Sequence, residues 1–235
     1  MPIPLALTDF KMTQATCEVR YEDAYLIYDR TGHVFHEIRG SFTDLKVINA
    51  SPPQTSFRCD EGTFALEVGQ CRFTSQKADT KLEVYAGQCK RFFDSVVGNL
   101  DIKVFTRIGL RVLFRKDFDD LQHAETALNS LQLANLGPPE RFGIASNPEE
   151  VLFRWQNQQL GTTLRFKAES GKIEIVLPPE LEADKPEIQK SFNGLVIDID
   201  YYTVAPVERS QWDASAWIPQ SFRTIKKHTD AILSR

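Results

Sequence analysis

The central segment Val104–Phe114 carries two arginines in a stretch that is otherwise apolar and strand-like. Arg107 and Arg111 flank Gly109, and side chains two or four positions apart share one face of a strand. The apolar residues between them point to the other face, into a core. A strand this apolar is not freely solvated, so the arginines need carboxylates or an anionic partner.

A second pair of charges lies late in the chain, where Asp198 and Asp200 share one face of another apolar strand. Paired aspartates can hold a divalent cation, and paired arginines can bind phosphate or carboxylate. Alternatively the two strands are neighbours, and Arg107 or Arg111 contacts Asp198 or Asp200 in a partly buried network. The sequence favours the network, so these four charges and Gly109 form a candidate structural or anion-binding site.

Aromatic residues near the C-terminus are a further candidate. Tyr202, Trp212 and Trp217 follow one another closely. Large aromatic side chains are enriched at protein interfaces, but they equally suit a core that docks the last helix. If these three residues form a binding site, we expect the partner to be a protein, either a different one or a second copy of this chain.

The markers of three large enzyme classes are missing from the sequence. It contains no G-x-S-x-G, no P-loop and no G-x-G-x-x-G, so we predict no catalytic residue and no cofactor. His33 and His36 lie three apart, but no further ligands stand at a metalloenzyme spacing, and we predict no metal. A non-enzyme is therefore the favoured class.

Composition and charge favour a cytoplasmic protein. The formal net charge of −4 argues against a general electrostatic interaction with nucleic acid. No apolar run approaches the roughly 18–20 residues of a membrane span, and the N-terminus does not resemble a secretory signal. The cysteines form no C-x-x-C pair, which is typical of free, buried thiols: Cys17, Cys59, Cys71 and Cys89.

The hydrophobic pattern predicts an α+β fold with a mostly antiparallel sheet. Two similar halves, 1–136 and 137–235, each combine a run of strands with a closing helix. The closing helices are predicted over Asp119–Ala134, capped by Asp119, and from Ser215–Ile218 onward. No residue-by-residue repeat is visible, so an internal duplication stays open.

The local pattern predicts four further elements. We predict a helix within Ala24–Phe42, although Thr31-Gly32 also suits a hairpin turn. Two strands are predicted over Thr63–Thr74 and Lys81–Ala86. A later hairpin is predicted to turn at Ser170-Gly171.

Several motifs together resemble a sporadically distributed, uncharacterised bacterial protein family of about this length. They are Arg-Ile-Gly-Leu-Arg at 107–111, Asp-Ile-Asp at 198–200, Phe-x-Ser at 73–75 and the last helix. The sequence departs from the family pattern at 112–114, where Val-Leu-Phe replaces a Tyr-Ile-Asn type of continuation. The resemblance implies no catalytic residues, and its scattered distribution implies gene neighbourhoods linked to mobile elements or defence.

We therefore expect a non-catalytic protein-binding or regulatory module. The resemblance extends this expectation to an accessory component of a bacterial anti-phage defence or toxin–antitoxin system. Two alternatives stay open. Asp198 and Asp200 would serve a metal-dependent nuclease or phosphodiesterase, and exposed sheet edges would serve a chaperone-like module that binds extended peptides.

Overall fold

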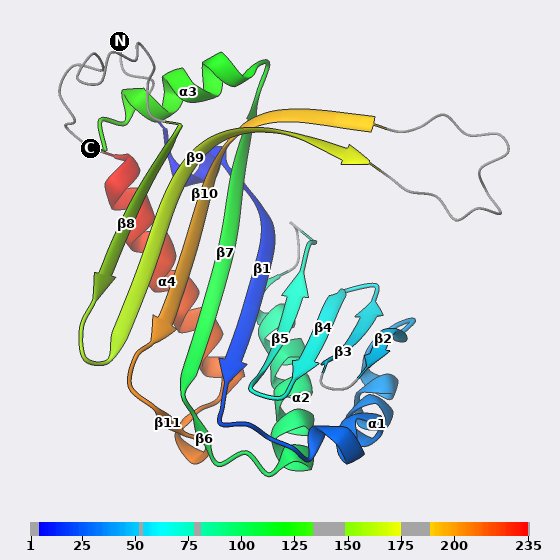
Figure 1. The fold of residues 1–235 in the computed structure, drawn as a ribbon. Helices are drawn as coiled ribbons and strands as arrows, with labels where there is room; N and C mark the ends of the chain where they lie inside the picture. Colours follow the sequence, from blue (N-terminus) through cyan, green and yellow to red (C-terminus); the bar gives the residue numbers. More distant parts are fainter. Residues whose placement is uncertain (1–4, 52–53, 78–80, 134–148, 175–188, 235) are drawn as a thin grey trace, which may run out of the picture.

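The computed structural model describes residues 5–51, 54–77, 81–133, 149–174 and 189–234. Within these residues, four α-helices pack against a nine-stranded antiparallel sheet, and a small two-stranded sheet lies at one end (Figure 1). The predicted α+β class with a mostly antiparallel sheet is confirmed. No helix of the described ranges is long and apolar enough to cross a membrane.

The large sheet has the strand order β2-β3-β4-β5-β1-β7-β10-β9-β8, with antiparallel neighbours throughout. Its strands are β1 (Lys11–Arg20), β2 (Lys46–Ser51), β3 (Gln54–Cys59), β4 (Gly62–Glu67), β5 (Gln70–Ser75), β7 (Arg107–Phe118), β8 (Glu150–Gln156), β9 (Leu160–Glu174) and β10 (Gln189–Thr203). The small sheet pairs β6 (Val104–Phe105) with β11 (Val207–Glu208).

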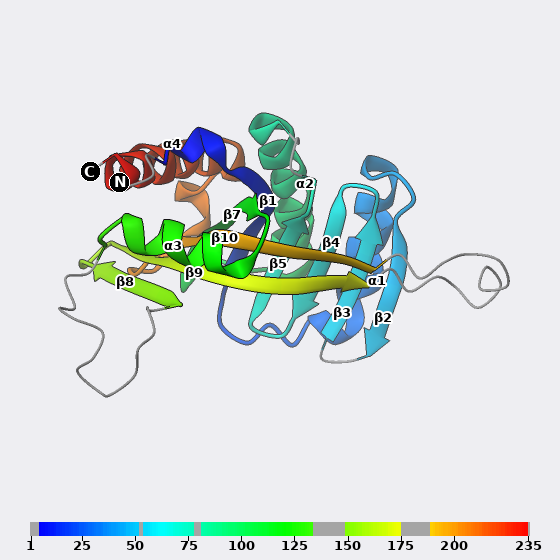
Figure 2. The ribbon, with the colours of Figure 1, turned by 90° about the horizontal axis from the view of Figure 1, so that it is seen from above.

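The α-helices are α1 (Ile27–Ile38), α2 (Leu82–Leu100), α3 (Leu121–Ser130) and α4 (Ala214–Leu233), and short 3-10 helices occupy Leu7–Asp9, Arg39–Ser41 and Arg209–Gln211. α1, α2 and α4 lie on one face of the large sheet, and α3 packs on β9 and β10 near one end (Figures 1 and 2). The helix predicted within Ala24–Phe42 is therefore confirmed. Asp120 caps the N-terminus of α3, one residue later than the predicted cap Asp119. Its Oδ1 accepts a hydrogen bond from the backbone N–H of His123 at 2.8 Å.

The order of elements repeats once along the chain, but the two repeats do not follow the predicted bounds 1–136 and 137–235. The first repeat is closed by α2, and the helix predicted to close it, which is α3, lies within the second repeat. Each repeat begins with a strand and a helix, continues with an antiparallel meander and ends with a long helix. The opening strands, β1 and β7, pair at the centre of the sheet, and the last strand of each meander, β5 or β10, lies beside its opening strand. The predicted boundary after residue 136 falls outside the described residues, and the repeat of elements restarts at β7.

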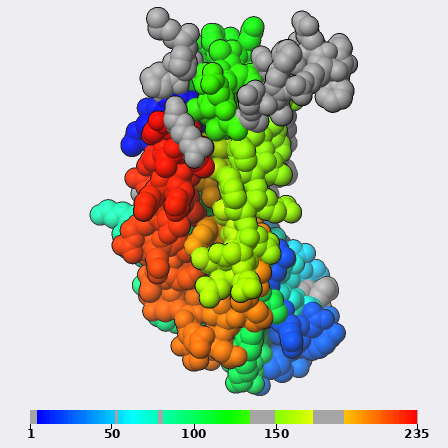
Figure 3. Space-filling view, turned by 90° about the vertical axis from the view of Figure 1, so that its left-hand side faces the viewer, coloured from blue at the N-terminus to red at the C-terminus, as the bar shows by residue number. Residues whose placement is uncertain are grey.

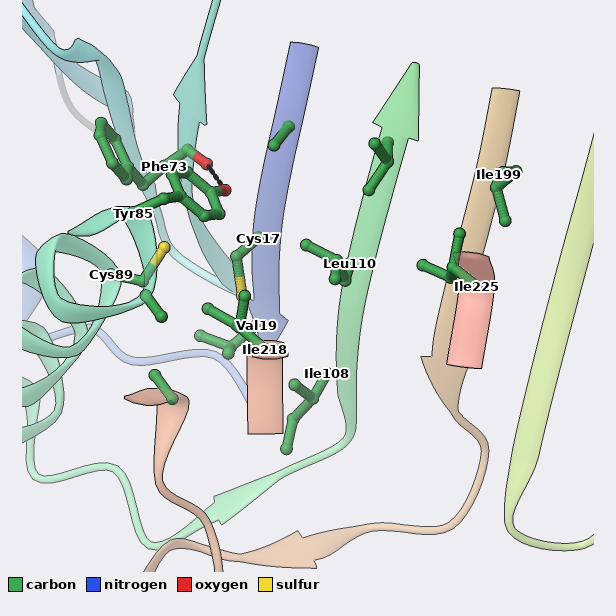
Figure 4. Packing of buried hydrophobic residues seen from close by; sticks show 14 of the residues in the cluster. Cys17, Val19, Phe73, Tyr85, Cys89, Ile108, Leu110, Ile199, Ile218 and Ile225 are labelled. Carbon is green, nitrogen blue, oxygen red and sulfur yellow. Dashed lines mark hydrogen bonds between the residues drawn. The ribbon is translucent and has the colours of Figure 1, made fainter. Parts of the chain in front are cut away.

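The core lies between the helices and the inward faces of the central strands (Figure 4). Cys17 and Val19 of β1 are fully buried there, as are Ile108 and Leu110 of β7. The neighbouring residues in these strands point to the opposite side, as the strand period of two requires. One face of the sheet is therefore apolar and covered, while the other is free to carry charge.

The strand predicted over Lys81–Ala86 is wrong, because this segment opens α2. The buried residues Tyr85, Cys89, Phe92 and Val96 follow a three-to-four spacing that extends back into the segment. The hydroxyl of Tyr85 donates to the backbone oxygen of Phe73 at 3.0 Å, which satisfies a polar group inside the core (Figure 4).

The single strand predicted over Thr63–Thr74 is also wrong, because the chain turns between β4 and β5. The turn predicted at Ser170-Gly171 does not form, since β9 runs through it to Glu174. Gly171 pairs with Phe192 of β10, and a Cβ on this glycine would lie 2.5 Å from the Phe192 ring. The glycine thus makes room for a cross-strand ring and does not mark a turn.

The four cysteines are free and buried. Burial raises the pKa of the Cys17 and Cys71 thiols, and raises that of Cys59 to about 11. We expect the native protein at pH 8 to leave all four thiols unreacted with Ellman's reagent, because only the thiolate reacts. After unfolding in guanidinium, all four should react. Rapid reaction of a native thiol would contradict this packing.

Candidate functional site

The face of the large sheet opposite α1, α2 and α4 carries no helix in the part of the chain that the structure describes (Figures 1 and 2). Alternate residues of β5, β1, β7, β10 and β9 point to this side, and most of them are charged or polar. We call this surface the open face. Its centre is formed by Thr16, Glu18, Arg20, Arg72, Thr74, Arg107, Gly109, Arg111, Asp198, Asp200 and Tyr202.

Arg107 joins three strands at the centre of the open face. Its Nη1 donates to Glu18 Oε1 on β1 at 3.0 Å, and its Nη2 donates to Asp200 Oδ2 on β10 at 2.7 Å. The side chains of Arg107, Glu18 and Asp200 are only 19%, 16% and 30% exposed. The guanidinium also lies over the ring of Tyr202, 4.6 Å from its centroid. Arg107 therefore neutralises two carboxylates that are largely withdrawn from water.

Gly109 provides the space that Arg107 occupies. A Cβ on this glycine would lie 2.8 Å from Nη1 and 3.2 Å from Cζ of Arg107. Gly109 pairs with Glu18 on one side and with Tyr202 on the other, so the guanidinium crosses the glycine on its way to β1 and β10. The glycine of the Arg-Ile-Gly-Leu-Arg motif thus has a steric reason.

Arg111 makes the second contact between the arginine pair and the aspartate pair. Its Nε donates to Asp198 Oδ1 at 2.8 Å, and its Nη2 donates to Oδ2 at 2.6 Å. This bidentate geometry is the strongest form of arginine–carboxylate pairing. The hydrogen bond to Asp198 raises the pKa of Arg111. The contacts predicted between the two charge pairs are therefore present, one through each arginine.

The pKa of Asp200 is raised, although its carboxylate accepts a hydrogen bond from Arg107. Burial is the largest cause, and it outweighs the opposing effect of Arg107, while the nearby Glu18 raises the pKa further. The folded protein therefore binds this proton more tightly than the unfolded chain does. Asp200 contributes stability below its unfolded pKa near 3.9, and that contribution is lost as the pH rises through the folded pKa.

This raised pKa predicts how Asp200→Asn changes the pH dependence of stability. We expect the free energy of unfolding of the wild type, minus that of Asp200→Asn, to increase as the pH falls from 7 to 4. Urea denaturation at each pH measures the difference. A difference that decreases on acidification would mean that Arg107 stabilises the ionised form more than burial opposes it.

The stacking of an arginine on an aromatic ring occurs twice across β7 and β10. Arg107 lies over Tyr202, and Arg115 lies over Phe192 with 4.3 Å to the ring centroid. Each ring covers a glycine of β9. A Cβ on Gly161 would lie 2.5 Å from the Tyr202 ring, and a Cβ on Gly171 would lie 2.5 Å from the Phe192 ring. These stacks hold the arginine side chains in fixed positions on the open face.

The three aromatic residues predicted to bind a partner do not share one surface. Tyr202 belongs to the open face, whereas Trp212 is partly buried against Phe93 and Phe105, with ring centroids 5.5 and 5.1 Å away. Trp217 of α4 lies beside Tyr201 on the inward side of β10, at 6.4 Å between centroids. Trp212 and Trp217 therefore belong to the packing of the helix side.

A depression of about 310 Å³ lies where β5, β1 and β7 run side by side. Its lining comprises Gln14, Thr16, Glu18, Arg20, Arg72, Thr74, Arg107, Gly109, Arg111 and Asp200. The sequence pointed to the four residues from β7 and β10 but not to those from β1 and β5. Alternation in β1 does place Glu18 and Arg20 opposite Cys17 and Val19, but it does not reveal which strand lies alongside.

Two apolar grooves lie away from this depression. One, of about 300 Å³, runs between α4 and the strands β8, β9 and β10, and includes Trp155, Tyr201 and His228. Figure 3 shows α4 lying alongside these strands. The other, also about 300 Å³, lies between α1 and the β2–β3 hairpin and includes Phe35 and Phe57.

Among the described residues, no cluster of three or more His, Cys, Asp or Glu side chains is arranged to hold a metal ion. The carboxylates of Asp198 and Asp200 both accept hydrogen bonds from arginines. A cation at this pair would have to displace Arg107 or Arg111.

Comparison with known proteins adds little. No family model matches the chain, and no curated protein matches it. One similar solved structure is the di-domain ARO/CYC StfQ from the steffimycin biosynthetic pathway, with 11% identity, 94% of this chain and 96% of that chain covered, and a TM-score of 0.18. A TM-score this low supports no statement about fold or function.

Proposed function

We propose that the protein is a non-catalytic protein-binding or regulatory module that binds its partner through the open face. The observation that supports this is a sheet face on which no helix of the described residues packs, and whose charged side chains are already fixed by ion pairs and aromatic stacking. Preorganised side chains lose little conformational entropy on binding, and arrays of fixed charge select a complementary partner.

A metal-dependent nuclease is less well supported by the same geometry. Asp198 accepts hydrogen bonds from Nε and Nη2 of Arg111, and Asp200 accepts one from Arg107. Binding a divalent cation there would break these hydrogen bonds and leave the arginines beside the cation. The carboxylates are used within the protein, and this use favours the binding function.

A chaperone-like function has one observation of its own. β2 is an edge strand of the sheet, its six residues are all exposed, and Val47 and Ile48 are 48% and 50% exposed. An exposed edge can accept an extended peptide as an added strand. The groove between α1 and the β2–β3 hairpin lies beside this edge and offers apolar side-chain sites.

Affinity capture from the native host with tagged variants separates these candidates. Thr163→Trp adds bulk to the open face at β9, and Gln220→Trp adds the same bulk to the exposed side of α4. Val47→Lys alters the β2 edge. We expect Thr163→Trp alone to abolish capture of the partner.

Each other outcome opposes the open-face proposal. Loss with Val47→Lys alone supports strand addition at the β2 edge. Loss with Gln220→Trp alone assigns binding to the helix side, and equal capture by all variants contradicts an open-face site. Analytical ultracentrifugation of the same variants tests a second copy of the chain as the partner.

The biological setting is proposed from the family resemblance alone. It is a bacterial cytoplasm, where the protein is an accessory component of an anti-phage defence or toxin–antitoxin system. Capture of a toxin or defence protein encoded beside this gene would support the setting. Capture of a housekeeping protein through the open face would contradict it while leaving the binding function intact.

A further inference from the structure

We infer that the depression on the open face binds an oxyanion, meaning a phosphoryl or carboxylate group. The inference deepens the proposed function and rests on it for the source of the anion, which the partner would present. The site itself lies wholly within this chain and can be tested with small anions. Its chemistry follows from the floor, the charges and the unused donors of the depression.

The floor of the depression is made of small and hydroxyl-bearing residues. Thr16 of β1 pairs with Thr74 of β5, and their hydroxyl oxygens lie 3.0 Å apart. Thr16 also pairs with Arg111 of β7 on its other side, and Gly109 adds no side chain. The hydroxyl groups of Thr16 and Thr74 therefore line the floor of the depression, and the longer arginine side chains form its walls.

The charges of the lining are unequal, because four arginines accompany two carboxylates. Glu18 Oε1 accepts from Nε of Arg20 at 2.8 Å and from Nη1 of Arg107 at 3.0 Å. Asp200 accepts from Arg107. Both carboxylates are thus neutralised by neighbours within the lining. Arg111 pairs with Asp198, and Arg72 lies 3.6 Å from Glu67, just outside the lining. The charge that an anion can meet is therefore the exposed part of these two guanidinium groups, and not a net excess of charge.

Arg72 and Arg111 keep donors that an incoming anion can use. The Nη2 of Arg72 lies 3.6 Å from Glu67, beyond ordinary hydrogen-bond distance, and its side chain is 38% exposed. Arg111 is half exposed and uses Nε and Nη2 for Asp198, which leaves Nη1 of its five-donor guanidinium. The two arginines stand on β5 and β7, on either side of Thr16, and their forked donors match the oxygens of phosphate or carboxylate.

Isothermal titration calorimetry at low ionic strength with pyrophosphate and citrate tests the site, since the two anions represent the two sources. We expect saturable binding of at least one, and Arg72→Gln should weaken it about tenfold, a loss near 1.4 kcal/mol. Arg58→Gln is the matched control, because Arg58 is exposed on β3 and lies outside the lining. Thr74→Val removes a floor hydroxyl without changing charge and should also weaken binding.

The inference is overturned if neither anion binds saturably to the wild type. It is equally overturned if Arg58→Gln weakens binding as much as Arg72→Gln does, because the anion would then sense only net charge. If a partner is captured through the open face but neither anion binds, only the oxyanion site is lost. If an anion binds while no partner depends on the open face, the proposed function is lost instead.

Discussion

Replacing Arg107 with methionine is expected to lower the free energy of unfolding by about 3 kcal/mol at neutral pH. The change leaves the carboxylates of Glu18 and Asp200 without their shared partner, although both are largely buried. Methionine keeps an apolar side chain over the Tyr202 ring, so lost packing contributes little. Urea denaturation monitored by circular dichroism measures the change.

Arg20→Met is the matched control for this prediction. Arg20 contacts the same Glu18 oxygen at 2.8 Å, but its own side chain is half exposed. An exposed ion pair contributes about 0–1 kcal/mol, so this variant should stay close to the wild type. Equal losses in the two variants would mean that Arg107 is no more than a surface charge.

Gly109→Ala is expected to lower the free energy of unfolding by about 2 kcal/mol, because the new methyl group displaces the Arg107 guanidinium from its carboxylates. Alanine is otherwise at least as favourable as glycine within a strand. The cost should therefore depend on Arg107. In an Arg107→Met background, Gly109→Ala should cost under about 0.5 kcal/mol, which a double-mutant cycle measures.

Gly32→Ala in α1 is a control for which we expect the free energy of unfolding to rise and not to fall. Nothing lies within 4 Å of a Cβ at this position, so the substitution should stabilise the helix by about 0.5–1 kcal/mol. Additive effects of Gly109→Ala and Arg107→Met would refute the crossing of the glycine by the guanidinium.

The strand period made part of the candidate site predictable from sequence. Alternation assigned Arg107, Arg111, Asp198 and Asp200 to faces, and the need to neutralise charge beside apolar strands paired them. The structure contains an ion pair between Arg107 and Asp200 and another between Arg111 and Asp198. These inferences needed only the local pattern and the cost of an unpaired charge.

The contributions of β1 and β5 were not predictable in the same way. Glu18 and Arg72 join the site through strand order and register, and these depend on which distant segments pair. The steric role of Gly109 also depends on the direction in which one long side chain folds. Trp212 was predicted to bind a partner, but it packs between Phe93 and Phe105 inside the molecule. This packing depends on tertiary contacts, which the local sequence does not reveal.

The depression lies where the two repeats meet. β5 and β1 of the first repeat supply the threonines, Glu18, Arg20 and Arg72, whereas β7 and β10 of the second supply Arg107, Arg111 and Asp200. The pairing of β1 with β7 therefore both completes the sheet and assembles the candidate site.

The central claim is that the partner binds the open face, and site-specific photo-crosslinking tests it most directly. The native cysteines are all buried, so a benzophenone maleimide will label a single introduced thiol. Leu152→Cys places the label on β8 at the border of the open face, where Leu152 pairs with the outward-pointing Arg165 of β9. Lys226→Cys places it on the exposed side of α4. We predict a covalent adduct with the captured partner from Leu152→Cys and none from Lys226→Cys. An adduct from Lys226→Cys alone would contradict the account.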